Sequence, residues 1–181
     1  MKNRFATVAT LLGMAFLIGH ATLSFAQDVN VDYDHHANFE RYHTYSWKMV
    51  KTPNTIWDQR VQDSVNQQLQ KKGWQLVPSG GDAVLSAIGT TQQHTELQTF
   101  YNGPGWGGWG WGGGFGTATT TPQQYNVGTL VVDMFDPNTK QLIWRGVAQD
   151  TLSDKPSKNQ DKLDKATEKM FKNFPPKPKE S

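Results

Sequence analysis

The sequence predicts an α+β domain in which an antiparallel or mixed β-sheet carries two α-helices on one face, in the order ββαβββα. Two observations lead to this class. Five segments have the alternating or β-branched pattern of extended chain, and two segments repeat apolar residues every three or four positions. Because each predicted helix has a single apolar face, a sheet covered on one side by both helices buries all of these surfaces.

The N-terminal residues have the pattern of an export signal. Lys2 and Arg4 precede an apolar run over residues 5–18, and Ser24 and Ala26 occupy the −3 and −1 positions of a cleavage site. The run is shorter than the about 20 apolar residues that span a bilayer. Residues 1–26 are therefore predicted to be a signal peptide, and cleavage near Ala26 should release a periplasmic or secreted protein without a transmembrane anchor.

The composition of the remaining chain limits its partners and its chemistry. The two basic residues of the leader account for the excess of 18 Lys and Arg over 16 Asp and Glu, so the exported part is close to neutral. Nucleic acid is not an expected partner, because a neutral protein has no general attraction to phosphate. The chain has no cysteine, hence no disulfide, thiol nucleophile or lipid-anchor cysteine. Residues 27–176 suffice for one domain, and 177–181 should form a disordered tail.

The first two strands are predicted by different patterns. In residues 28–34, Val29, Val31 and Tyr33 alternate with polar side chains, which is the period of a half-buried strand. Residues 42–47 are aromatic and β-branched, which favours a second short strand although they do not alternate.

The first helix has the clearest periodicity in the chain. Four apolar side chains recur every four residues between positions 55 and 72, with Thr55 as the expected N-cap and Gly73 as the left-handed stop. The stripe consists of Trp57, Val61, Val65 and Leu69.

A long hairpin should follow the first helix. Residues 82–101 are apolar first and polar last, and residues 117–136 show the reverse order. Two such segments predict antiparallel strands with residues 103–116, a flexible Gly/Trp-rich loop, at the tip. Residues 136–141 have the Pro and Asn of a type I turn, so residues 142–152 should return as the next strand.

The last predicted element is a helix that ends before Pro175. Ser157 and Gln160 have the spacing of a capping box at its start. The apolar stripe along it consists of Leu163, Ala166, Met170 and Phe174.

Several of these segments resemble a known exported family. They are "DYDHHANFERYHTYSW", "KKGW", "DAVLSA", "GTLVVDMFDPNTKQLIWRG" and "NFPP". Over residues 28–176 the chain resembles the bacterial family called domain of unknown function 4136 (DUF4136). The most specific parts of the resemblance are the set Asp34, Asn38, Phe39, Tyr42 and Trp47, and the segment from Gly128 to Gly146 that ends in "WRG". The resemblance implies an envelope protein, often a lipoprotein, to which no catalytic residues are assigned.

No catalytic, cofactor-binding or metal-binding motif stands out in the sequence. If the first strand continued through Asp32, Asp34 and His36, these side chains would share a face and could form a weak metal site. Asp133 and Asp136 are interpreted as solvated surface. Arg145 is expected to pair with a carboxylate, beside a core Trp144.

The predicted function is therefore binding rather than catalysis, through the aromatic loop. No charged side chain occurs from Leu97 to Val132, and glycine at this density keeps a loop mobile. Its planar side chains could contact an unknown envelope protein, glycan or lipid. The alternatives are tolerated low-complexity sequence, an envelope hydrolase with an unrecognised site, and the metal site above. The proposed contact residues are Tyr101, Trp106, Trp109, Trp111, Phe115 and Tyr125.

Overall fold

The computed structural model describes residues 27–101 and 118–177. The predicted signal peptide, the loop over 103–116 and most of the predicted tail therefore lie outside the described residues. The elements are β1 (Asp28–Tyr33), the 3-10 turn η1 (Phe39–Arg41), β2 (Thr44–Lys51), α1 (Thr55–Lys71), β3 (Gln75–Leu76), β4 (Ala83–Tyr101), β5 (Ala118–Phe135), β6 (Leu142–Thr151) and α2 (Pro156–Met170).

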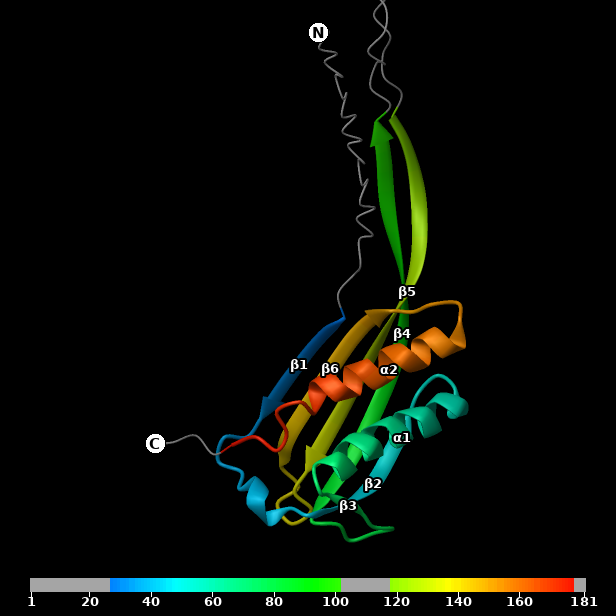
Figure 1. Ribbon diagram of the computed structural model, residues 1–181. Coiled ribbons are helices and arrows are strands. Elements are labelled where there is room, and N and C mark those ends of the chain that lie inside the picture. The colour runs from blue at the N-terminus through cyan, green and yellow to red at the C-terminus, as the bar shows by residue number, and fades with distance from the viewer. Residues whose placement is uncertain (1–26, 102–117, 178–181) are drawn as a thin grey trace, which may run out of the picture.

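The strands form one six-stranded sheet in the order β1-β6-β5-β4-β2-β3, and both helices lie on the same face of it (Figure 1). The sheet is mixed, because β2 runs parallel to β3 and β4 while the other pairs are antiparallel. The predicted α+β class and the order ββαβββα are confirmed. The sequence did not predict β3, whose two residues follow α1 after a three-residue turn and pair with Thr44 and Tyr45.

Both helices begin differently from the prediction. Asn54, not Thr55, caps α1, and its Oδ1 accepts a hydrogen bond of 2.8 Å from the Ile56 amide. The capping box at Ser157 is wrong, since α2 begins at Pro156 and its N-cap residue makes no side-chain capping bond. Proline at the first position favours a helix start by itself, because its fixed φ suits the helix and its missing N–H leaves no unpaired donor. Gly73 has the expected positive φ of 82° after α1.

The core lies between the helices and the sheet and is rich in aromatic rings. Trp144, on β6, is 1% exposed and stacks on Phe171 with ring centroids 4.7 Å apart. Phe174 packs edge-on against both rings and against Trp74. The expected burial of Trp144 is confirmed. Because Phe171 and Phe174 follow α2, the turn after that helix belongs to the core.

Two carboxylates join segments that are distant in the sequence. Asp136 is 8% exposed and accepts a hydrogen bond of 2.9 Å from the Tyr42 hydroxyl, so its interpretation as solvated surface is wrong. The Thr139 amide and the Tyr42 hydroxyl lower the pKa of Asp136. Asp82 accepts hydrogen bonds from the His43 and Thr44 amides, which lower the pKa of its carboxyl. These two side chains connect the start of β2 and the residues just before it to the start of β4 and the end of β5.

The sheet face opposite the helices carries an ion pair. Arg145, on β6, forms a two-pronged pair with Asp133 on β5, with N–O distances of 2.6 and 2.7 Å. The predicted pairing of Arg145 with a carboxylate is confirmed. The hydrogen bonds and negative charge of Asp133 raise the pKa of the Arg145 guanidinium.

β4 and β5 continue well beyond the rest of the sheet. They pair from Val84↔Phe135 to Tyr101↔Ala118, whereas β2 leaves β4 after Ile88 and β6 leaves β5 after Val127. We call residues 93–101 and 118–126 the arm, and the remainder of the fold the body. Figure 1 shows the arm as a two-stranded ribbon that projects past both helices.

Candidate functional site

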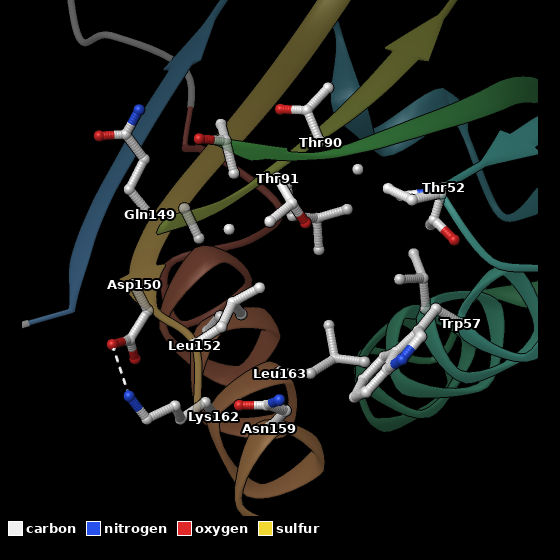
Figure 2. Close-up of a pocket in the computed structure, with 18 of the residues that line it drawn as sticks. Thr52, Trp57, Thr90, Thr91, Gln149, Asp150, Leu152, Asn159, Lys162 and Leu163 are labelled. Carbon is white, nitrogen blue, oxygen red and sulfur yellow. Dashed lines mark hydrogen bonds and ion pairs between the residues drawn. The ribbon is translucent and has the colours of Figure 1, made fainter. Parts of the chain in front are cut away.

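A hollow lined mainly by apolar residues lies between α1, α2 and the sheet, where the arm leaves the body. We call it the inter-helix cavity. Its volume is about 330 Å³, which is at the lower end of the range for small-molecule sites. Figure 2 shows Trp57 from α1 and Leu163 from α2 on one side of it, and Thr90 and Thr91 from β4 on the other.

The wall of the inter-helix cavity is mainly apolar. α1 supplies side chains from its first two turns and α2 from its middle, and the sheet supplies the floor. These residues are Trp57 and Val61 on α1, Leu163 and Ala166 on α2, and Leu130 and Ala148 on the sheet. Such a lining favours an apolar occupant, because burying its surface contributes roughly 25 cal/mol per Å².

Small residues keep the space open. Ala148 and Ala166 stand where larger side chains would fill the gap between sheet and helices. Gly128 lets Leu152 lie directly on β5, since an added Cβ would approach Leu152 Cδ2 to 2.8 Å. Gly89 does the same for Thr52, whose Cγ2 would lie 3.0 Å from such an atom. A methyl group on either strand would push these side chains outward.

Several polar side chains at or beside the rim have partners within the protein. Lys162 Nζ donates to Asp150 Oδ1 at 2.9 Å, as the dashed line in Figure 2 marks. Asn159 holds the backbone of Ser153 through two hydrogen bonds of 2.7 Å. Thr52 lines the cavity, and its amide donates a bond of 2.6 Å to Asp58 on α1. The rim is therefore held in place by its own side chains.

A polar contact between the helices lies next to the cavity. Ser64 on α1 is 4% exposed and lies within hydrogen-bond distance of Asp164 Oδ1, at 2.8 Å, and of Thr167 Oγ1, at 2.7 Å. Thr167 also donates to the Asp164 carbonyl. These bonds fix the spacing of α1 and α2 one turn beyond Val61.

The structure places only part of the predicted contact set. Tyr125 lies in the arm, half-buried, and its ring stacks on His94 with centroids 5.7 Å apart. Tyr101 is the last residue of β4. Trp106, Trp109, Trp111 and Phe115 lie outside the described residues.

The geometry assumed for the alternative metal site is wrong. β1 ends at Tyr33, so Asp34 and His36 lie in the following turn, where Asp34 Oδ1 accepts a bond of 2.8 Å from the His36 amide. Asp32 instead points its Oδ1 at the Tyr33 amide. Over residues 27–101 and 118–177, no three His, Asp or Glu side chains come together as a metal-binding group.

Sequence reasoning did not find the inter-helix cavity. Trp57 and Val61 were interpreted as core, and Trp57 is only half-buried. The available signal was the set of small residues in otherwise bulky strands, such as Gly89 and Gly128. It becomes meaningful only when the strands are paired, because these two glycines lie 39 positions apart in the chain but near one another on β4 and β5.

The described residues contain no helix that is long and apolar enough to cross a membrane. No curated protein sequence matches the chain.

Solved structures with a related fold share little sequence with this chain. A PDZ domain protein from Parabacteroides distasonis matches 83% of this chain with a TM-score of 0.56 and 11% identity. The match covers 36% of that chain, so the present chain spans about a third of it. PelC from Paraburkholderia phytofirmans, crystallised as a dodecamer, matches 81% of this chain and 95% of its own at a TM-score of 0.47 and 11% identity. At these identities the first match supports the fold alone.

The family assignment comes from the sequence itself. The model of the DUF4136 family, described as a domain of unknown function, matches residues 29–176. That range includes every helix and strand of the structure except the first residue of β1. The match agrees with the resemblance carried by the motifs around Tyr42 and Gly146, and the chain belongs to the DUF4136 family.

Proposed function

We propose that this protein is an exported, non-catalytic binding protein that holds a single acyl chain, or an apolar small molecule of similar size, in the inter-helix cavity. The observation that carries the proposal is the apolar wall of Trp57, Leu163 and their neighbours around an open volume of about 330 Å³. At the ~30 Å³ that a water molecule takes in the liquid, the volume suits roughly ten non-hydrogen atoms.

The rim supports recognition by shape rather than by charge. Lys162 is paired with Asp150, and Asp58 and Asn159 are occupied by backbone groups. A ligand that entered with its own charge would have to break one of these contacts. An apolar chain loses nothing there and gains the burial of its surface.

A non-catalytic role is supported by the state of the titratable groups around the cavity. General acid–base catalysis needs a group that can reach a substrate and exchange a proton with it. Asp150 and Asp58 are instead engaged in the contacts described above. The Ser64 hydroxyl lies beside Asp164 and Thr167 with no histidine in that group, so it lacks the base that activates a serine nucleophile.

The binding test uses full-length protein exported to the periplasm, stripped of lipid and titrated with nonanol, which has ten non-hydrogen atoms, in a calorimeter. The Ala148→Leu variant should fill the cavity and weaken binding at least about tenfold, equivalent to roughly 1.4 kcal/mol. Val147→Leu adds bulk to the opposite face of the same strand and should bind normally. Equal binding by both variants, with unchanged melting, would contradict the proposal.

Export is tested separately. Expression with the natural N-terminus should give a periplasmic protein whose mass corresponds to a chain that begins at Gln27. A cytoplasmic product of full mass would overturn the export part of the proposal and leave the cavity untouched.

The aromatic loop remains a second predicted contact region. Replacing residues 103–116 by a short Gly/Ser turn should reduce retention by isolated envelope fractions without changing the melting transition. Unchanged retention would favour tolerated low-complexity sequence.

A further inference from the structure

The arm has two strand edges that nothing covers within the described part of the chain. The last pair between β2 and β4 is Lys51↔Ile88, and the last between β6 and β5 is Val127↔Thr151. An isolated pair of strands is marginally stable in water, and a free edge is a template for pairing with another strand.

The direction of the backbone groups at these edges follows from one hydrogen bond. The Leu152 amide donates to the Asn126 carbonyl at 2.7 Å, so Asn126 directs its backbone groups away from β4. Its partner Gln93 must then direct its own groups away from β5, and the pattern alternates along both strands. The free edge of β5 therefore presents Gln124, Pro122 and Thr120, and the free edge of β4 presents Gln93, Thr95, Leu97 and Thr99.

The two edges differ in their capacity to accept another strand. Pro122 has no N–H, and it lies where that N–H would face solvent, so it interrupts the β5 edge without weakening the ladder to β4. Proline and lysine on an edge are the usual means of preventing strand addition. Neither occurs in β4 beyond Ile88. The β4 edge is thus the one open to pairing.

We propose that two copies of this chain associate through the free β4 edges, antiparallel, about a two-fold axis at Thr95. In this register His94 of each copy lies opposite Glu96 of the other, which gives two complementary pairs on one face of the new sheet. A register centred on Glu96 would instead place the two carboxylates against each other, which is unfavourable. The single carboxylate of each ribbon and the imidazole that lies opposite it in the other copy therefore favour this alignment.

The residues that pair in this register lie beyond the end of β2 on β4. Residues 91–99 of one copy run beside residues 99–91 of the other, and β2 has already left β4 at Ile88. Because the strands are antiparallel, the two bodies lie at opposite ends of the joined arms. Two ribbons of two strands become one sheet of four strands, which adds a hydrogen-bonded neighbour to each β4. This inference uses only arm residues and does not depend on a ligand in the inter-helix cavity.

Cross-linking tests the register directly, since the chain has no cysteine of its own. In the proposed dimer the two copies of residue 95 form a hydrogen-bonded pair with Cα atoms about 5.5 Å apart, within the range of a disulfide. Thr95→Cys should therefore form a covalent dimer under mild oxidation. Leu97→Cys lies on the same edge and face, but its two copies would be about 13 Å apart at ~3.3 Å per residue, and it should stay monomeric in reducing-agent-free gels.

Proline substitutions test the edge without cysteine chemistry. Thr95→Pro removes an outward N–H from β4, and Gln124→Pro removes one from β5, so both should leave the β4–β5 ladder intact. Light scattering should show the dimer dissociation constant raised about tenfold or more by Thr95→Pro, since two symmetric bonds are lost, and unchanged by Gln124→Pro.

A charge exchange provides the last control. Glu96→Lys should weaken the dimer. The double variant His94→Glu, Glu96→His should restore it, because position 94 of each copy still faces position 96 of the other with one histidine and one glutamate. A monomer at every soluble concentration would overturn the proposal, as would equal cross-linking at positions 95 and 97.

Discussion

The body and the arm are built from the same two long strands, yet different forces hold them. In the body, β4 carries Leu85 and Ala87 into a core that both helices cover, and these side chains are at most 1% exposed. In the arm, Leu97 on the same strand is 68% exposed. The contacts recorded there are polar or aromatic pairs across the ribbon, such as Thr99 with Thr120 and His94 with Tyr125.

This difference shows that strand length and fold stability are separate properties. Burial of apolar surface is the main favourable term in folding. Nearly all of the buried apolar side chains of the described structure belong to the body. The arm adds backbone hydrogen bonds whose net contribution is modest, because water competes for the same groups. We therefore expect the body to fold without the arm, and the arm to gain order from whatever binds to its edges. The following predictions test that division.

The largest effect is expected in the aromatic core. Trp144→Ala removes a side chain that is 1% exposed and stacked on Phe171, and should lower the free energy of unfolding by about 3–5 kcal/mol. Leu97→Ala in the arm should change it by less than about 0.5 kcal/mol. Urea denaturation followed by circular dichroism measures both. Similar losses of unfolding free energy in the two variants would mean that the arm and the body unfold as one cooperative unit.

A smaller effect is expected from the buried carboxylate. Asp136→Ala leaves the Tyr42 hydroxyl and the Asn138 and Thr139 amides without their acceptor, which should cost about 1–3 kcal/mol. Asp133→Ala breaks a pair whose arginine is 47% exposed, and such a surface pair is worth about 0–1 kcal/mol. If the Asp133 variant were the less stable of the two, the assignment of Asp136 as an anchor would be wrong.

The same anchors give the body its pH dependence. The pKa values of Asp82 and Asp136 are lower in the folded protein than the ordinary 3.8. Their stabilisation is therefore complete above pH 3.8 and is lost as the pH falls through the lower folded values. Asp82→Asn should reduce the dependence of the unfolding free energy on pH in the acid range, whereas Glu96→Gln in the arm should leave this dependence unchanged. Denaturant titrations at a series of pH values measure both variants.

The opposite sign applies at alkaline pH. Burial raises the pKa of Tyr45 to about 12, and burial together with Asp136 raises that of Tyr42 to about 12. Stability from both hydroxyls is present below pH 10 and is lost as the pH rises toward 12. Tyr45→Phe should reduce the alkaline loss. A loss of the same size in the Phe variant would assign it to other groups.

The smallest effect is expected from excision of the arm. Replacing residues 93–126 by an Asn-Gly turn retains the pair Gln92↔Val127 and supplies a favoured hairpin connection. The unfolding free energy should change by less than about 1 kcal/mol, and the amides of β5 beside β6 should keep their protection from hydrogen exchange. Collapse of that protection would show that the arm supports the body.

The element pattern could be predicted because it is local. The four-residue spacing of Trp57, Val61, Val65 and Leu69 identified α1, and the mirrored polarity of residues 82–101 and 117–136 identified the β4–β5 hairpin. Boundaries were less accurate, since Asn54 and Pro156 compete with several plausible caps within one turn. β3 was missed because its two residues carry no period, and they become a strand only by pairing with Thr44 and Tyr45.

The candidate site could not be predicted in the same way. The inter-helix cavity is a space between side chains that different elements contribute, such as Trp57, Leu130 and Leu163. Its existence depends on where the helices cross the sheet, and no period in the sequence encodes that. Asp136 was misjudged for the same reason, since its neighbours in the chain are polar and its burial comes from Tyr42, which is distant in sequence.

The sequence by itself determined the fold class, the two amphipathic helices, the long hairpin and the family, because each depends on residues that are close in the chain or on a whole-length pattern. Only the tertiary structure decided the strand order β1-β6-β5-β4-β2-β3, the cavity beneath the helices and the strand edge that is left open on the arm. The physical reason is that pairing and packing join surfaces from remote segments, and their fit is a property of the assembled fold.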